Sequence, residues 1–216
     1  MLLRDLEKLV QRGEGERLEF KHKAADPQKI MKEVVAFANH KGGTLILGVD
    51  DNLKINGVKY VEEEEYAMTE AIETYCNPVP EYTIEKILIT QKRTILIYRI
   101  SQSEKKPVFL LYNLKKKVGK AYFRVADKSV QASRELRQIL KWRSQSDRNS
   151  FFEYGELERK LMQLIEREGK TTIAQFAQEA EISSQKAASI LVRLTTSNLL
   201  KIQPNDEEDF YLVKEV

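Results

Sequence analysis

Residues 14–51 read EGERLEFKHKAADPQKIMKEVVAFANHKGGTLILGVDD, and this stretch decides the fold. At its start, residues 17–21 alternate apolar and charged side chains, as a half-buried strand does. Apolar residues then recur at helical spacing, which predicts an amphipathic helix over residues 27–39. After a glycine pair, residues 44–49 form an apolar run typical of a strand buried on both faces. The stretch is therefore predicted to be a strand–helix–strand unit.

Both ends of the predicted helix carry start and stop signals. Asp26 is a favourable N-cap, and Pro27 stands where a first-turn proline is tolerated. Gly42 and Gly43 follow the helix and predict a C-cap with a close turn into the next strand. The alternative is a phosphate cradle at these glycines, but the sequence has no G-x-x-x-x-G-K-[ST] pattern around them.

The motif E-x-x-x-x-E-F-K, from Glu14 to Lys21, precedes AFANHKGGTLILGVDD at residues 36–51. Together they resemble the AlbA-type DNA-binding domain, which is also the core repeated in Schlafen proteins. A weaker match extends the resemblance over residues 1 to about 140, and it implies an α+β fold with a mixed sheet. Family members usually carry Arg-x-Gly-Ser-Ser after the last strand, whereas this chain has Ala126 in place of the glycine.

Composition limits the classes of protein that fit the chain. Its 216 residues are 42% hydrophobic and 32% charged, with a net charge of +3, which indicates a globular protein rather than a disordered one. A single cysteine, Cys76, excludes an intramolecular disulfide framework. No apolar run has the length of a membrane span, so we expect a cytoplasmic protein without membrane association.

The chain is predicted to have two domains. Residues 1–143 form the Schlafen/AlbA-like domain, residues 144–153 are a polar linker, and residues 154–216 form a small winged helix-turn-helix domain. In the first domain, the remaining helices are predicted at 1–12, 65–76 and 133–141, and the remaining strands at 82–90, 94–101, 107–112 and 121–125. In the second, helices begin near 154 and cover 174–179 and 184–197, before a ribbon of residues 198–203 and 210–213.

Carboxylates near the ends of the predicted strands form a candidate site. Glu14, Glu19 and Asp50 come from different elements, and such groups can hold Mg²⁺ or Mn²⁺ through oxygen. In RNA-cleaving Schlafen proteins, two glutamates of this motif and an aspartate after the apolar strand form the active site. The resemblance therefore implies a catalytic set of Glu14, Glu19, Lys21 and one of Asp50 and Asp51. The alternative is that these carboxylates pair with neighbouring lysines and arginines or cap turns.

Basic and polar side chains form a second candidate site, for nucleic acid. Lysines in turns can follow a phosphate backbone, and short polar groups on a helix can read base edges. The candidates in the first domain are Lys115, Lys116, Lys117, Lys120 and Arg124. Those on the third helix of the second domain are Ser184, Gln185, Lys186, Ser189 and Arg193. The wing tip at residues 205–209 is acidic, which disfavours backbone contact by the wing and favours dimerisation or protein contact.

These patterns predict a nucleic-acid-binding protein, specifically a DNA-binding transcriptional regulator. The resemblance also suggests a homodimer, since two recognition helices would read two half-sites. We expect DNA rather than RNA as its partner, and binding itself requires no cofactor. One alternative is a metal-dependent ribonuclease that uses the three-carboxylate site. Another is a regulatory protein that binds a nucleotide of the ATP type.

Overall fold

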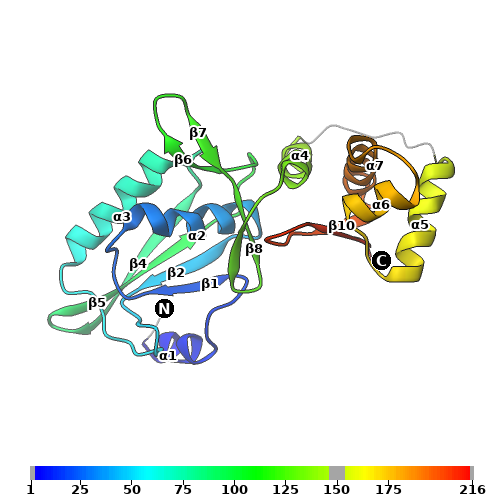
Figure 1. Ribbon diagram of the computed structural model, residues 1–216. Coiled ribbons are helices and arrows are strands. Elements are labelled where there is room, and N and C mark those ends of the chain that lie inside the picture. The colour runs from blue at the N-terminus through cyan, green and yellow to red at the C-terminus, as the bar shows by residue number, and fades with distance from the viewer. Residues whose placement is uncertain (1–2, 146–153, 215–216) are drawn as a thin grey trace. The chain divides into compact units, whose positions relative to one another are not determined.

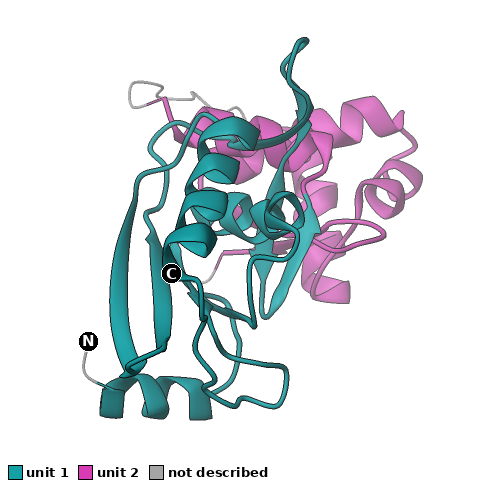
Figure 2. Ribbon diagram, turned by 90° about the vertical axis from the view of Figure 1, so that its left-hand side faces the viewer, with its two compact units in different colours: residues 1–131 teal, residues 132–216 magenta. Residues whose placement is uncertain are grey.

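A computed structural model of the chain describes residues 3–145 and 154–214. It has two compact units, unit 1 (Met1–Gln131) and unit 2 (Ala132–Val216), which Figure 2 shows in different colours. The division precedes the helix predicted at 133–141, so that helix belongs to unit 2 and not to the first domain. Most of the predicted linker lies outside the described residues.

Unit 1 is built on a four-stranded sheet with the order β1-β2-β5-β4. The strands are β1 (Leu18–Lys21), β2 (Gly43–Leu47), β4 (Tyr82–Thr90) and β5 (Arg93–Ile100). The first two pair in parallel, while β5 pairs antiparallel with both of its neighbours. The predicted mixed sheet is therefore confirmed.

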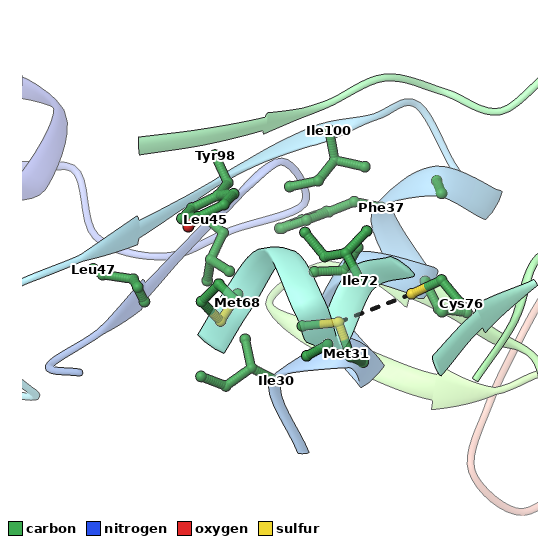
Figure 3. Close-up of a cluster of buried hydrophobic side chains, with 14 of the residues drawn as sticks. Ile30, Met31, Phe37, Leu45, Leu47, Met68, Ile72, Cys76, Tyr98 and Ile100 are labelled. Carbon is green, nitrogen blue, oxygen red and sulfur yellow. Dashed lines mark hydrogen bonds between the residues drawn. The ribbon is translucent and has the colours of Figure 1, made fainter. Parts of the chain in front are cut away.

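Helices cover both faces of this sheet (Figure 1). Helices α2 (Pro27–Asn39) and α3 (Val61–Tyr75) cover one face, and α1 (Leu3–Gln11) covers the other. Because side chains alternate along a strand, Leu45 and Leu47 of β2 join the α2–α3 core, shown in Figure 3, while Ile46 joins the α1 core. This two-sided burial is what the apolar run predicts.

The turn between α2 and β2 follows the predicted caps. Asp26 accepts a hydrogen bond from the backbone N–H of Lys29 at 3.3 Å. Gly42 has a φ of +72°, and its N–H donates to the carbonyl of Phe37 at 2.9 Å. A Cβ at Gly43 would lie 2.4 Å from the Phe37 ring. Backbone conformation and close packing therefore account for both glycines.

Two smaller sheets complete unit 1. One contains β3 (Cys76–Asn77), β6 (Phe109–Asn113) and β7 (Val118–Lys120), and the other is the hairpin of β8 (Tyr122–Val125) and β9 (Lys128–Gln131). Strands β3, β7 and β9 were not predicted from the sequence; they are two to four residues long and polar or mixed in character.

The described residues of unit 2 form four helices and a two-stranded antiparallel hairpin. Its elements are α4 (Arg134–Arg143), α5 (Glu156–Glu168), α6 (Ile173–Glu179), α7 (Ser184–Thr196), β10 (Leu200–Gln203) and β11 (Phe210–Val213). Its core joins Leu161 and Leu164 of α5 to Phe176 of α6 and Leu191 of α7. Across the described residues of both units, no helix has the length and apolar character needed to cross a membrane.

Candidate nucleic-acid interface and carboxylate positions

A buried arginine organises the carboxylates of unit 1. The Arg124 side chain, on β8, is 0% exposed and donates to Glu19 of β1 and Glu33 of α2, each at 2.7 Å. Its Nε and Nη2 also donate to the carbonyl of Gly15, at 3.1 and 2.9 Å, and Nη1 donates to the Ser129 hydroxyl at 3.2 Å. Each guanidinium nitrogen therefore has a protein acceptor, as a buried charge requires.

This burial differs from the surface position expected of a phosphate-binding Arg124. Its guanidinium lies over the Phe37 ring, 4.9 Å from the centroid, and connects three elements of unit 1. Its partners Glu33 and Ser129 were not predicted from the sequence. The only signal was the family pattern Arg-x-Gly-Ser-Ser after the last strand, which contains the arginine; its two serine positions are Asp127 and Lys128 in this chain, so it did not indicate Ser129.

The motif glutamates have structural partners as well. Besides Arg124, Glu19 accepts a hydrogen bond from Lys21, so the predicted catalytic lysine forms an ion pair with the predicted catalytic glutamate. Glu14 accepts from the backbone N–H of Phe20 at 2.8 Å, which closes the turn before β1.

Asp50 organises the turn that follows β2. Its carboxylate accepts from the backbone N–H groups of Lys54 and Asn52, both at 3.0 Å, and from the side-chain amide of Asn56 at 2.8 Å. The hydrogen bond from the Lys54 backbone is the largest factor lowering the pKa of Asp50. The neighbouring Asp51 is exposed to solvent.

Glu14, Glu19 and Asp50, the carboxylates of the predicted metal site, each have their own partners within the protein. Within residues 3–145 and 154–214, no three side chains of histidine, cysteine, aspartate or glutamate are grouped so that they could hold a metal ion. Glu14, Glu19 and Asp50 are therefore not assembled as a three-carboxylate cluster. Their contacts match the alternative in which the carboxylates pair with basic groups and cap turns.

The lysine candidates of unit 1 lie together on a protruding hairpin. We call residues 112–120 the arm; it comprises the end of β6, the turn and β7. Its four lysines, Lys115, Lys116, Lys117 and Lys120, are all exposed. Figures 1 and 2 show the turn of this hairpin extending beyond the rest of unit 1.

The arm also exposes apolar surface. Tyr112, Leu114 and Val118 are 63%, 45% and 40% exposed. The arm therefore combines positive charge with aromatic and aliphatic contact groups.

The polar candidates of unit 2 share one exposed face of α7. Ser184, Gln185, Lys186, Ser189 and Arg193 are all exposed, while Ala187, Ile190, Leu191 and Leu194 pack into the core. Arg193 also donates to Glu158 of α5. The division of α7 into a polar and an apolar face agrees with the sequence prediction.

The chain belongs to the Schlafen, AlbA_2 family, whose model matches residues 14–133, more than half of the sequence. This match ends near the boundary of unit 1, so unit 2 lies outside it. No curated protein matches the chain.

Several solved structures are similar to the chain, including the following two. The DIP2311 protein of Corynebacterium diphtheriae has 16% identity and a TM-score of 0.43; the match covers 98% of this chain but 38% of that protein. The N-terminal domain of a RecG-related protein from Nitrosomonas europaea has 23% identity and a TM-score of 0.42, with 72% of this chain and 97% of that domain covered. The chain thus spans well under half of the length of DIP2311.

Proposed function

We propose that this protein binds nucleic acid, and that the arm of unit 1 is its main electrostatic contact. The observation that carries the proposal is the convergence of four exposed lysines on one protruding hairpin. Lysines in such an array can each neutralise a phosphate and release its counterions. The exposed Tyr112 and Leu114 add contact surface for sugars and bases.

Binding is favoured over cleavage by the partners of the carboxylates. The Glu19 carboxylate accepts hydrogen bonds from Arg124 and Lys21, and the Asp50 carboxylate accepts them from groups of its own turn. A carboxylate that serves as a metal ligand or general base needs lone pairs directed at the ion or the substrate. The contacts of these two side chains direct their oxygens to the protein instead.

Unit 2 supports a more specific role. The order α5, α6, α7 and then the β10–β11 hairpin is that of a winged helix-turn-helix, with α7 as the helix that contacts nucleic acid. This order favours DNA over RNA and a transcriptional regulator over other binding proteins. Such a regulator would act as a homodimer, because two copies read the two halves of a symmetric site.

The test is a binding titration by fluorescence anisotropy, with labelled DNA and RNA over a range of salt concentrations. We expect Lys115→Ala, Lys116→Ala and Lys117→Ala together to weaken binding at least tenfold. The slope of log affinity against log salt should fall by about 2–3, at roughly 0.9 for each phosphate that the variant no longer neutralises.

The matched control removes the same charge from other elements. Lys8, Lys54 and Lys92 are exposed lysines outside the arm, and their replacement by alanine should change affinity by less than about threefold. Equal reductions in the two triple variants would show that only net charge matters and would contradict a specific role of the arm. Unchanged affinity in the arm variant would also contradict a specific role of the arm.

A further inference from the structure

A groove of about 740 Å³ runs between α4 and α7. It is lined from α4 by Arg134, Glu135, Gln138 and Trp142, and from α7 by residues that include Gln185, Ser189 and Arg193. These α4 residues follow one another at helical spacing, as do those of α7, so each helix turns one face to the groove. The polar face of α7 is thus one wall of a groove, and α4 is the other.

The anchoring of α4 makes this groove a built feature of unit 2. Ser133 caps α4 by accepting from the backbone N–H of Leu136 at 3.0 Å, and its hydroxyl also donates to Asp209 beside β11. Leu136 and Ile139 of α4 are buried. One end of α4 is therefore tied to the β10–β11 hairpin.

Two arginines, Arg134 and Arg193, and one acidic residue, Glu135, line the groove, and the other basic residues of its two helices lie outside that lining. The basic residues of the two helices are Arg134, Arg137, Lys141 and Arg143 on α4 and Lys186 and Arg193 on α7. Glu135 is the one acidic residue of the two helices, and Glu158 of α5 pairs with Arg193 from outside them. Arg193 is thus paired, and Arg134 is the lining residue that can contact a phosphate, with further basic residues on the same helices outside the groove.

Trp142 gives the groove an aromatic surface. It is half-buried and lines the groove, where the half-buried Ala188 and Val192 also lie. An indole ring beside basic and amide side chains is the combination by which proteins stack bases while they follow the backbone. Gln138, Gln185 and Ser189 can form hydrogen bonds to base edges.

The dimensions of the groove distinguish duplex DNA from a single strand as its ligand. A helix that reads duplex DNA occupies a major groove about 12 Å wide, with phosphate backbones on both sides. Because α4 stands beside the polar face of α7, that backbone would collide with α4. A single strand is narrow enough for a groove of this volume, which lies in the ~300–1,000 Å³ range of small-ligand sites.

We infer that the α4–α7 groove binds single-stranded nucleic acid, with Trp142 stacking on a base and Arg134 contacting a phosphate. This inference rests on the proposed binding of nucleic acid, but it replaces the duplex-reading role of α7 in a winged helix-turn-helix with the binding of a single strand by unit 2. The comparison of strand with duplex below decides between the two. Arg134 and Trp142 were not predicted from the sequence, because the helix that carries them was assigned to the other domain.

The experiment uses Trp142 as its own reporter, since it is the only tryptophan in the chain. Full-length protein is titrated with a short DNA strand of mixed sequence and, separately, with the duplex made from it. Tryptophan emission reports on the groove, and anisotropy of the labelled DNA reports on total binding. We expect the strand to quench Trp142 saturably and the duplex to quench it at least tenfold more weakly.

Two variants test the residues. Trp142→Ala should weaken single-strand binding about tenfold, the loss of one stacked base. Arg134 is exposed, and Arg134→Gln should weaken single-strand binding about threefold or more. This variant keeps Trp142, so its tryptophan emission also verifies that unit 2 is folded. Leu199→Ala is the matched control, because Leu199 is an exposed apolar residue of unit 2 outside the groove. The affinity of this variant for the single strand should be unchanged.

Three other outcomes would contradict the inference, and they differ in what they imply for the proposed function. Stronger quenching by the duplex than by the strand overturns the inference. So does single-strand binding that leaves Trp142 emission and the affinity of Arg134→Gln unchanged, although the proposed function then stands on the arm. Anisotropy that stays flat with strand, duplex and RNA refutes the proposed function and the inference together.

Discussion

Replacing Arg124 by methionine should lower the free energy of unfolding of unit 1 by about 3–5 kcal/mol. Methionine keeps much of the volume and apolar contact of the arginine stem but removes the charge. The substitution leaves Glu19 and Glu33 in place, with side chains only 7% and 16% exposed. Two carboxylates that water cannot solvate well then lack their shared counter-ion.

The magnitude follows from what remains after the substitution. Glu19 retains its ion pair with Lys21, which offsets part of the loss. Glu33 retains the hydroxyl of Ser129. The carbonyl of Gly15 loses both donors from Arg124 and keeps the backbone N–H of Leu18 at 3.4 Å. Breaking a buried pair by removing one partner typically costs about 3–5 kcal/mol, whereas a surface pair is worth about 0–1 kcal/mol.

The assay is chemical denaturation followed by far-UV circular dichroism. Arg99→Met is the control, since Arg99 lies on β5 of the same unit and donates to Glu85 at 3.0 Å in an exposed pair. We expect the control to change stability by less than about 1 kcal/mol. If Arg124→Met costs no more than Arg99→Met, the network does not stabilise unit 1 and the structural role given to Glu19 is wrong.

Three more predictions concern single positions. Ala126 has a φ of +52°, so Ala126→Gly should stabilise the β8–β9 hairpin by about 1 kcal/mol in thermal or chemical unfolding, and Ala25→Gly, at an exposed position where φ is not positive, should give no gain. Burial raises the pKa of Cys76 to about 12, so a thiol reagent at neutral pH should modify the native protein far more slowly than the denatured one, and equal rates would contradict this burial. Burial also raises the pKa of Asp209, so the folded state holds this proton more tightly than the unfolded chain; the stability that Asp209 contributes is therefore present at low pH and lost as pH rises through its folded pKa. Asp209→Asn should flatten that part of the pH–stability curve, and an unchanged curve would refute the assignment.

Local sequence patterns predicted the elements near residues 14–51 well. The helix at Pro27–Asn39 has the predicted bounds, since its spacing, its cap and the following glycines all indicate the same ends. The strands β4 and β5 begin and end within one residue of their predicted positions. Short strands such as β7 and β9 were missed, because three or four residues carry too little periodicity to be recognised.

The features that the sequence did not predict depend on contacts between residues that are far apart in the chain. Spacing placed Glu14, Glu19 and Asp50 at neighbouring element ends, but it could not show that Glu19 pairs with Arg124, which is 105 residues away. The partner of α4 was unpredictable for the same reason, since an amphipathic helix shows which face is buried but not against which element. The left-handed conformation at Ala126 could have been predicted, because the family pattern has glycine at that position.

The Arg124 network also bears on the order of events during synthesis. The acidic partners Glu19 and Glu33 leave the ribosome first, and the arginine that neutralises them follows more than ninety residues later for Glu33 and 105 later for Glu19. At about 5–20 residues per second, the nascent chain carries these acids without Arg124 for roughly 5–20 s. The strand–helix–strand segment therefore cannot reach its final packing on its own, and translation past β8 is the step that lets unit 1 close.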